Sequence, residues 1–202
     1  LTSIVFVHLL HKFDFFHQSL RCRVFIALMA AISMLVMLTF GVPLIPAAPY
    51  LKYEPSGAVI LICGLLFGKY AALQCACLKS VLYFFIHGGN PYGILSDLIA
   101  TIAFTWLASG LYGKTHEVSR VRMAGCCLAG CISATLVMIP ANFAILPLQF
   151  GMSGTDVLAI MTYIIFFNLL KSICNSVLAG SIFPYILHVT QKLYHAEMKT
   201  SH

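Results

Sequence analysis

Residues 57–86 read GAVILICGLLFGKYAALQCACLKSVLYFFI, a largely apolar run that is broken at Gly68-Lys69-Tyr70 and contains one further charge, Lys79. A helix that crosses the hydrocarbon core of a bilayer needs about 20 apolar residues. The run is too long for one ordinary span and short for two. One long helix here would give the chain five spans in all, whereas two short helices joined by a tight turn at Gly68 would give six.

The composition of the whole chain indicates a membrane protein. Of the 202 residues, 60% are hydrophobic and 9% are charged, whereas a soluble domain carries roughly 25% charged residues. So few charges cannot cover a water-facing surface, and disordered chains are polar and charged. The apolar runs are continuous, unlike the short alternating segments of a transmembrane barrel. We therefore predict an all-α integral membrane protein.

The remaining apolar runs complete a predicted bundle. Four of them are long enough for one span each, at about 24–42, 94–112, 123–148 and 157–187. The flanking segments are more polar and are expected outside the bilayer core. We divide the chain into an N-terminal interfacial segment at 1–23, a six-helix membrane domain at 24–190 and a polar cytoplasmic tail at 191–202.

The basic residues decide between five and six spans. With six, nine of the twelve Lys and Arg residues face one side of the membrane and only Lys52 faces the other. With five, the basic loop at 113–122 would face the side opposite to the basic N-terminal segment. Because cytoplasmic loops carry an excess of Lys and Arg, we predict six transmembrane helices with both termini in the cytoplasm. The net charge of +6 is explained by basic residues in the loops on one side of the membrane and does not indicate a nucleic-acid partner.

Three ionisable residues fall inside the predicted spans: Lys79, Asp97 and Lys171. Each costs roughly 2.5–3.5 kcal/mol near the bilayer centre on insertion scales, so each requires a partner or a function. We expect the long stem of Lys79 to carry its ammonium toward the outer surface. Asp97 lies about one turn below an outer loop, where we expect it to be solvated. Lys171 is the deepest of the three.

Lys171 belongs to a polar stripe on the last span. Asn168, Lys171, Ser172 and Asn175 are spaced i, i+3, i+4 and i+7, which puts them on one face of a helix. Such a stripe either bonds neighbouring helices or forms one wall of a ligand pocket. A buried cation between amides exceeds what helix contacts require, so we favour the pocket. Asn142, between two prolines of the preceding span, is a second candidate.

Two further patterns have alternative interpretations. Lys52, Tyr53 and Glu54, in the first outer loop, are either an interfacial aromatic with a surface ion pair or ligand contacts. Ala27 and Ala31 on the first span allow another helix to approach closely, whether that helix is internal or belongs to a partner.

Catalysis finds little support in the sequence. It contains no HExxH, GxSxG or Walker A motif. The eight cysteines lie mostly in apolar runs and lack zinc-finger spacing, so we interpret them as reduced packing residues. We predict no catalytic residue, no metal site and no cofactor, and keep an integral membrane enzyme as the rival class.

The stretch from Pro43 to Gly113 resembles the substrate-binding S-components of energy-coupling factor (ECF) transporters, above all the riboflavin-specific ones. Those proteins carry a FLKYDPSD loop, a G-x-x-x-G turn and an LLKNLLH third helix. The corresponding segments here are YLKYEPSG, GLLFG and LKSVLYF, at 50–57, 64–68 and 78–84. Asn142 ahead of Pro147, Asn168 with Lys171, and Ala27-x-x-x-Ala31 resemble further family motifs.

This resemblance implies capture of riboflavin from outside the cell, for ATP-driven import by a transmembrane coupling subunit and two ATPase subunits. The chain would be a multi-pass protein of the bacterial plasma membrane, with Ala27 and Ala31 facing the coupling subunit. Gly57, Ser80, Ile94 and Asp97 depart from the family pattern, so another vitamin or a nucleobase-like substrate is the alternative. The implied ligand-binding residues are Lys52, Tyr53, Glu54, Asp97, Asn142, Asn168 and Lys171.

Overall fold

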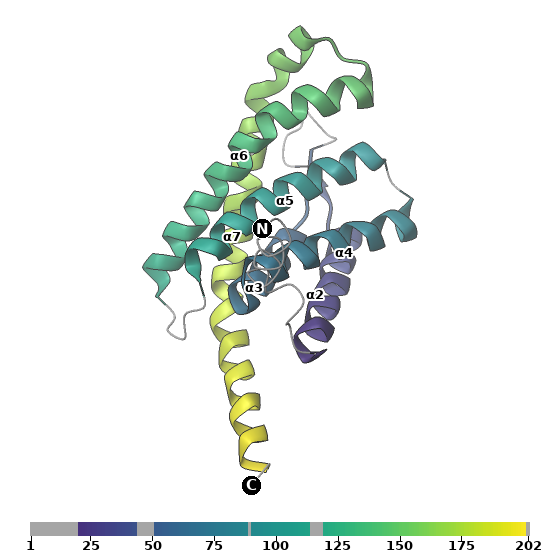
Figure 1. Ribbon diagram of the computed structural model, residues 1–202. Helices are drawn as coiled ribbons and strands as arrows, with labels where there is room; N and C mark the ends of the chain where they lie inside the picture. The colour runs from purple at the N-terminus through teal and green to yellow at the C-terminus, as the bar shows by residue number, and fades with distance from the viewer. Residues whose placement is uncertain (1–19, 44–50, 89, 114–118, 201–202) are drawn as a thin grey trace, which may run out of the picture.

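The structure is a computed structural model that describes residues 20–43, 51–88, 90–113 and 119–200, and these residues form a bundle of helices (Figure 1). A two-residue strand, β1 (Val42–Pro43), pairs antiparallel with β2 (Lys52–Tyr53). Most of the predicted N-terminal segment, residues 1–19, lies outside the described residues. The helices are α2 (Leu20–Thr39), α3 (Ser56–Phe67), α4 (Lys69–His87), α5 (Pro91–Tyr112), α6 (Arg120–Phe150) and α7 (Gly154–Thr200).

Five of these helices are long and apolar enough to cross a membrane, namely α2, α4, α5, α6 and α7. Large apolar side chains such as Leu35, Phe85 and Leu136 are exposed on the outside of the bundle, as expected where lipid is the solvent. The predicted all-α membrane bundle is thereby confirmed. The sixth helix, α3, has 12 residues and a length of about 18 Å, short of the roughly 30 Å hydrocarbon core.

The apolar run at 57–86 breaks at Gly68, as the two-helix interpretation predicts. Gly68 has φ +94°, a conformation that side chains with a Cβ rarely adopt. Its N–H donates to the carbonyl of Gly64 at 2.8 Å, which closes the last turn of α3. The single long helix is therefore excluded.

The short helix α3 lies at the centre of the bundle, where it contacts α2, α4, α5 and α7. Ile60, Leu61 and Cys63 are fully buried. Its apolar surface is thus covered by protein rather than by lipid, which explains how a helix of this length is accommodated.

The last two helices run side by side along one flank of the bundle (Figure 1). α6 passes through Pro140 and Pro147 without ending. α7 continues to Thr200, so the predicted tail at 191–202 is helical for most of its length. At 47 residues α7 is about 70 Å long, and its C-terminal part projects beyond the other helices in Figure 1.

Candidate functional site

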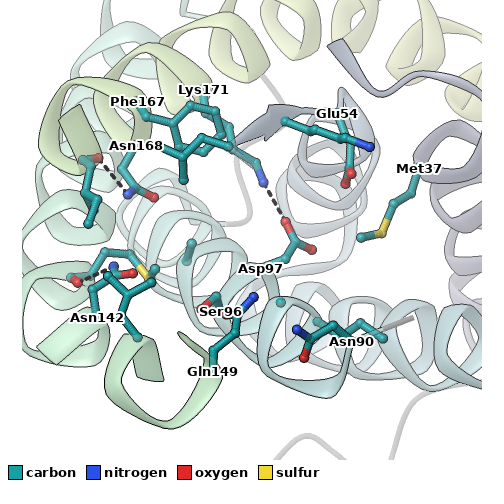
Figure 2. A pocket seen from close by; sticks show the side chains of 18 of the residues that line it. Met37, Glu54, Asn90, Ser96, Asp97, Asn142, Gln149, Phe167, Asn168 and Lys171 are labelled. Carbon is teal, nitrogen blue, oxygen red and sulfur yellow. Dashed lines mark hydrogen bonds and ion pairs between the residues drawn. The ribbon is translucent and has the colours of Figure 1, made fainter. Parts of the chain in front are cut away.

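A cavity of about 400 Å³ lies where the C-terminal end of α4 and the N-terminal end of α5 meet β2 and the α6–α7 pair. Because successive helices alternate in direction, elements far apart in the sequence bring polar residues to this one end of the bundle (Figure 2). Six of the predicted binding residues line it: Lys52, Glu54, Asp97, Asn142, Asn168 and Lys171.

The electrostatic centre of the site is Asp97. Lys171 Nζ donates to Asp97 Oδ1 at 2.6 Å, and Lys79 Nζ donates to Asp97 Oδ2. The exposed fractions are 0% for Lys79, 9% for Asp97 and 8% for Lys171. One carboxylate therefore joins α4, α5 and α7 through two buried ion pairs, of which Figure 2 shows the one with Lys171.

This arrangement corrects two expectations from the sequence. Lys79 does not reach toward the outer surface, because its ammonium is held inside by Asp97. Asp97 is not solvated, although it lies close to the end of its helix. The reason is energetic: a buried ion that finds a partner of opposite charge avoids much of the penalty that a lone ion incurs.

Two amides on neighbouring helices face the cavity in a common manner (Figure 2). Asn142 Nδ2 donates to the carbonyl of Met138 at 2.7 Å, and Asn168 Nδ2 donates to the carbonyl of Ile164 at 2.9 Å. Each bond goes back one turn along the helix and fixes the side chain. The amide oxygens are then left as hydrogen-bond acceptors, beside the ammonium donor of Lys171.

The polar stripe of α7 divides between the cavity and the contact with a neighbouring helix. Asn168 and Lys171 line the cavity, whereas Asn175 packs against the start of α3. Tyr53 Oη donates to Asn175 Oδ1 at 3.4 Å, and Tyr53 is not among the residues that line the cavity. A Cβ at Gly57 would lie 2.6 Å from Asn175 Nδ2, so a side chain at position 57 would require Asn175 to move.

Glu54 stands at the edge of the cavity, in the loop between β2 and α3. Burial raises the pKa of its carboxyl to about 7, and the negative charge of Asp97 adds to this shift. Lys171, Lys79 and Lys52 oppose the shift but do not cancel it. Glu54 therefore changes its charge near neutral pH, within reach of any molecule in the cavity.

The walls between these polar groups are apolar. Met138 and Leu146 of α6 and Ile164 and Phe167 of α7 belong to the lining of the cavity. A cavity with apolar walls and a few placed polar groups is the usual form of a small-molecule binding site. Within the part of the chain that the structure describes, no cluster of His, Cys, Asp and Glu could hold a metal ion.

Comparison with known proteins shows where this fold and cavity belong. Residues 23–183 match the model of a family described as the substrate-specific component of ECF transporters. The chain belongs to this family. S-components bind their vitamin substrate and associate with other components of the transporter, so the chain is a transporter subunit and not an enzyme. It is a multi-pass integral protein of the bacterial plasma membrane.

Individual relatives agree with this placement. The riboflavin transporter RibU of Streptococcus thermophilus is 28% identical, over 89% of this chain and 89% of its own length. The protein of the same name in Staphylococcus aureus is 28% identical, over 75% and 82%. The riboflavin transporter FmnP of Bacillus subtilis is also 28% identical, over 79% and 88%.

A solved structure supports the fold independently. The S component of a bacterial ECF transporter superposes with a TM-score of 0.73 and covers 86% of this chain and 99% of its own. At 24% identity, this likeness establishes the shared fold of the two proteins.

Sequence reasoning missed several residues of this S-component's site. The ammonium of Lys79 is expected near the outer surface but pairs with Asp97, and the available signal was that Asp97 is the one anionic residue within the predicted spans. Asn90 and Ser96 belong to the loop and first turns of α5, where the GGNPYG segment was the available signal. The additional polar residues that line the cavity are Tyr83, His87, Asn90, Ser96 and Gln149.

The small residues of α2 do not all share one environment in this S-component. Ala27 is exposed and Ala31 is half-buried. Ala30 and Ser33 are fully buried, and Ser33 Oγ donates to the carbonyl of Ser56 at 2.9 Å. Ala27 and Ala31 are thus on the outer side of the helix, whereas Ala30 and Ser33 serve internal packing.

Proposed function

We propose that this S-component captures riboflavin from outside the cell and presents it for ATP-driven import. The observation that carries the proposal is the polar edge of the cavity, where the ammonium of Lys171 lies with the amides of Asn142 and Asn168. The relatives named as riboflavin transporters support it from a separate direction.

The isoalloxazine ring of riboflavin has a uracil-like edge that carries carbonyl acceptors and one N–H donor. The free amide oxygens of Asn142 and Asn168 suit the N–H, because one N–H of each amide is bonded to a backbone carbonyl and so orients the side chain. Lys171 suits a ring carbonyl, because an ammonium has three donors and Asp97 accepts one of them. The rest of the ring is flat and apolar, and suits the surface between Met138, Leu146 and Phe167.

The ribityl chain requires several hydroxyl partners. Asp97 and Glu54 offer carboxylate acceptors on the opposite side of the cavity from Asn142, and Lys52 offers a donor at its edge. Tyr53 would act indirectly, since its hydroxyl holds Asn175. Of the departures from the family pattern, Gly57 and Ser80 are outside the cavity lining, whereas Ile94 and Asp97 belong to it.

The proposed topology has six crossings and both termini in the cytoplasm. α3 would make the second crossing, shielded by the helices around it and helped by local thinning of the bilayer. Lys69 and the 113–119 loop then face the cytoplasm, which satisfies the positive-inside rule. The cavity opens toward the outside, where riboflavin is available.

The proposed partners are a transmembrane coupling subunit and two ATPase subunits, because the chain contains no nucleotide-binding motif of its own. Ala27 and Ala31 are the proposed contact with the coupling subunit. The exposure of Ala27 supports this role, since single methyl side chains permit a close helix contact.

Equilibrium titration tests the proposal. Purified protein, stripped of bound ligand, should quench the fluorescence of riboflavin with a stoichiometry of one per chain. Lumichrome, which has the ring but no ribityl chain, should bind more weakly. Failure of both flavins to bind to folded protein would refute riboflavin capture.

A further inference from the structure

Lys79 is a charged residue with no direct access to the cavity. It is fully buried and is not among the lining residues. Its ammonium contacts Asp97 Oδ2 and lies 3.6 Å from Met37 Sδ. A lysine in such a place is costly to keep, and a methionine of similar length would fill the same space.

The charges around the cavity suggest what Lys79 contributes. Lys79, Asp97 and Lys171 together carry two positive charges and one negative charge. Without Lys79, Asp97 and Lys171 would neutralise each other as a simple pair. Glu54 and Lys52 are the other charged groups that line this side of the cavity, one of each sign.

We propose that Lys79 is a positioning residue for ligand binding: it holds one oxygen of Asp97, so that Lys171 retains uncompensated positive charge and free N–H donors for the ligand's polar edge. This rests on the proposed function, because it concerns how the same cavity recognises the carbonyl edge of a flavin. Lys79 acts through Asp97 and Lys171 and does not touch the ligand.

Asp97 and the ligand compete for the ammonium of Lys171. Lys171 Nζ already donates to Asp97 Oδ1 at 2.6 Å. When Asp97 is shared with a second cation, its attraction for Lys171 is partly satisfied elsewhere. A ligand carbonyl then receives a charge-assisted bond, which is about twice as strong as a neutral one.

A pair of variants tests this directly. Lys79→Met should weaken riboflavin binding about tenfold, the loss expected when a charge-assisted hydrogen bond falls to the strength of a neutral one. Adding Asp97→Asn to Lys79→Met should then make riboflavin bind about threefold more tightly than it does to Lys79→Met alone, because Lys171 no longer has a carboxylate to neutralise it, although the ribityl chain then meets an amide oxygen in place of the carboxylate. Lys69→Met, on the same helix but away from the cavity, is the matched control and should bind normally.

The rescue distinguishes this role from a structural one. If Lys79 only braces the bundle, the double variant will bind as weakly as Lys79→Met or more weakly, and the proposal is overturned. Unchanged affinity in folded Lys79→Met would overturn it as well. Should Lys79→Met alone fail to fold, the double variant Lys79→Met with Asp97→Asn is compared with and without Lys171→Met. Loss of Lys171 must then weaken riboflavin binding at least as much as it does in the wild type, and a smaller loss overturns the proposal. A wild-type protein that binds no flavin would instead refute the proposed function.

Discussion

Replacing Lys171 by methionine should reduce riboflavin affinity while leaving the bundle folded. The loss concerns one charged hydrogen bond to the ligand, which is worth about 1.5–3 kcal/mol. This corresponds to a dissociation constant about 10- to 150-fold larger. Methionine retains most of the length of the lysine stem, so little packing against Phe167 should be lost.

The structure also indicates why folding should survive. Asp97 would keep Lys79 as its partner, so removal of Lys171 leaves a balanced buried pair. By contrast, Asp97→Asn would leave two buried cations close together and without an anion between them. Removal of one member of a buried pair typically costs about 3–5 kcal/mol of stability. Lys171→Met should therefore lower thermal stability much less than Asp97→Asn.

The assay is titration of riboflavin fluorescence against each purified variant, with thermal unfolding in detergent as the control for folding. Lys69→Met serves as the matched loss of a lysine from the end of α4 that is remote from the cavity. If folded Lys171→Met bound riboflavin with wild-type affinity, Lys171 would not contact the ligand. The assignment of the flavin edge to this face of α7 would then be wrong.

Three further predictions concern pH, topology and the partner surface. The pKa of Glu54 rises from 4.5 to about 7, so the folded protein retains a proton that the unfolded chain loses across this window. The contribution of Glu54 to the free energy of unfolding should therefore fall by about 3 kcal/mol as pH rises from 4.5 to 7. Thermal unfolding of Glu54→Gln should lack this contribution, and an equal dependence of stability on pH in both proteins would contradict the raised pKa of Glu54. In a background without the native cysteines, an impermeant maleimide applied to intact cells should label Gly154→Cys, where added side-chain atoms meet open space, but not Thr115→Cys. The reverse pattern would invert the topology. Ala27→Trp should bind riboflavin normally yet fail to copurify with a coupling subunit, since an indole prevents close helix approach; normal uptake by this variant would remove Ala27 from the interface.

Much of the fold was predictable because the bilayer imposes simple rules on sequence. The apolar runs identified the long helices, and Gly68 marked the turn between α3 and α4, since its φ of +94° favours glycine. The pairing of β1 with β2 was not predictable, because strands of two residues carry no periodicity. Nor could proline positions establish that α6 continues through Pro140, since neighbouring helices determine whether a proline ends a helix.

The candidate site was predictable to the extent that its residues lay on one helix face. The i, i+3 spacing of Asn168 and Lys171 predicted that both lie on one polar face of α7. Spacing along α7 could not show that Asn175 contacts Gly57 of α3 instead. The ion pairs of Asp97 do not follow from the sequence, because the position of Lys79 and Asp97 along their spans indicates only how deep each residue lies in the membrane. Pairing across helices depends on how the helices pack, and depth in the membrane carries no information about that.

The most direct test of the central claim is an experimental structure of this S-component with riboflavin bound. We expect density for one flavin in the cavity, with its carbonyl edge within hydrogen-bonding distance of Asn168 and Lys171 and its ribityl chain toward Asp97 and Glu54. A flavin bound elsewhere, or with its ring edge turned away from Lys171, would contradict it.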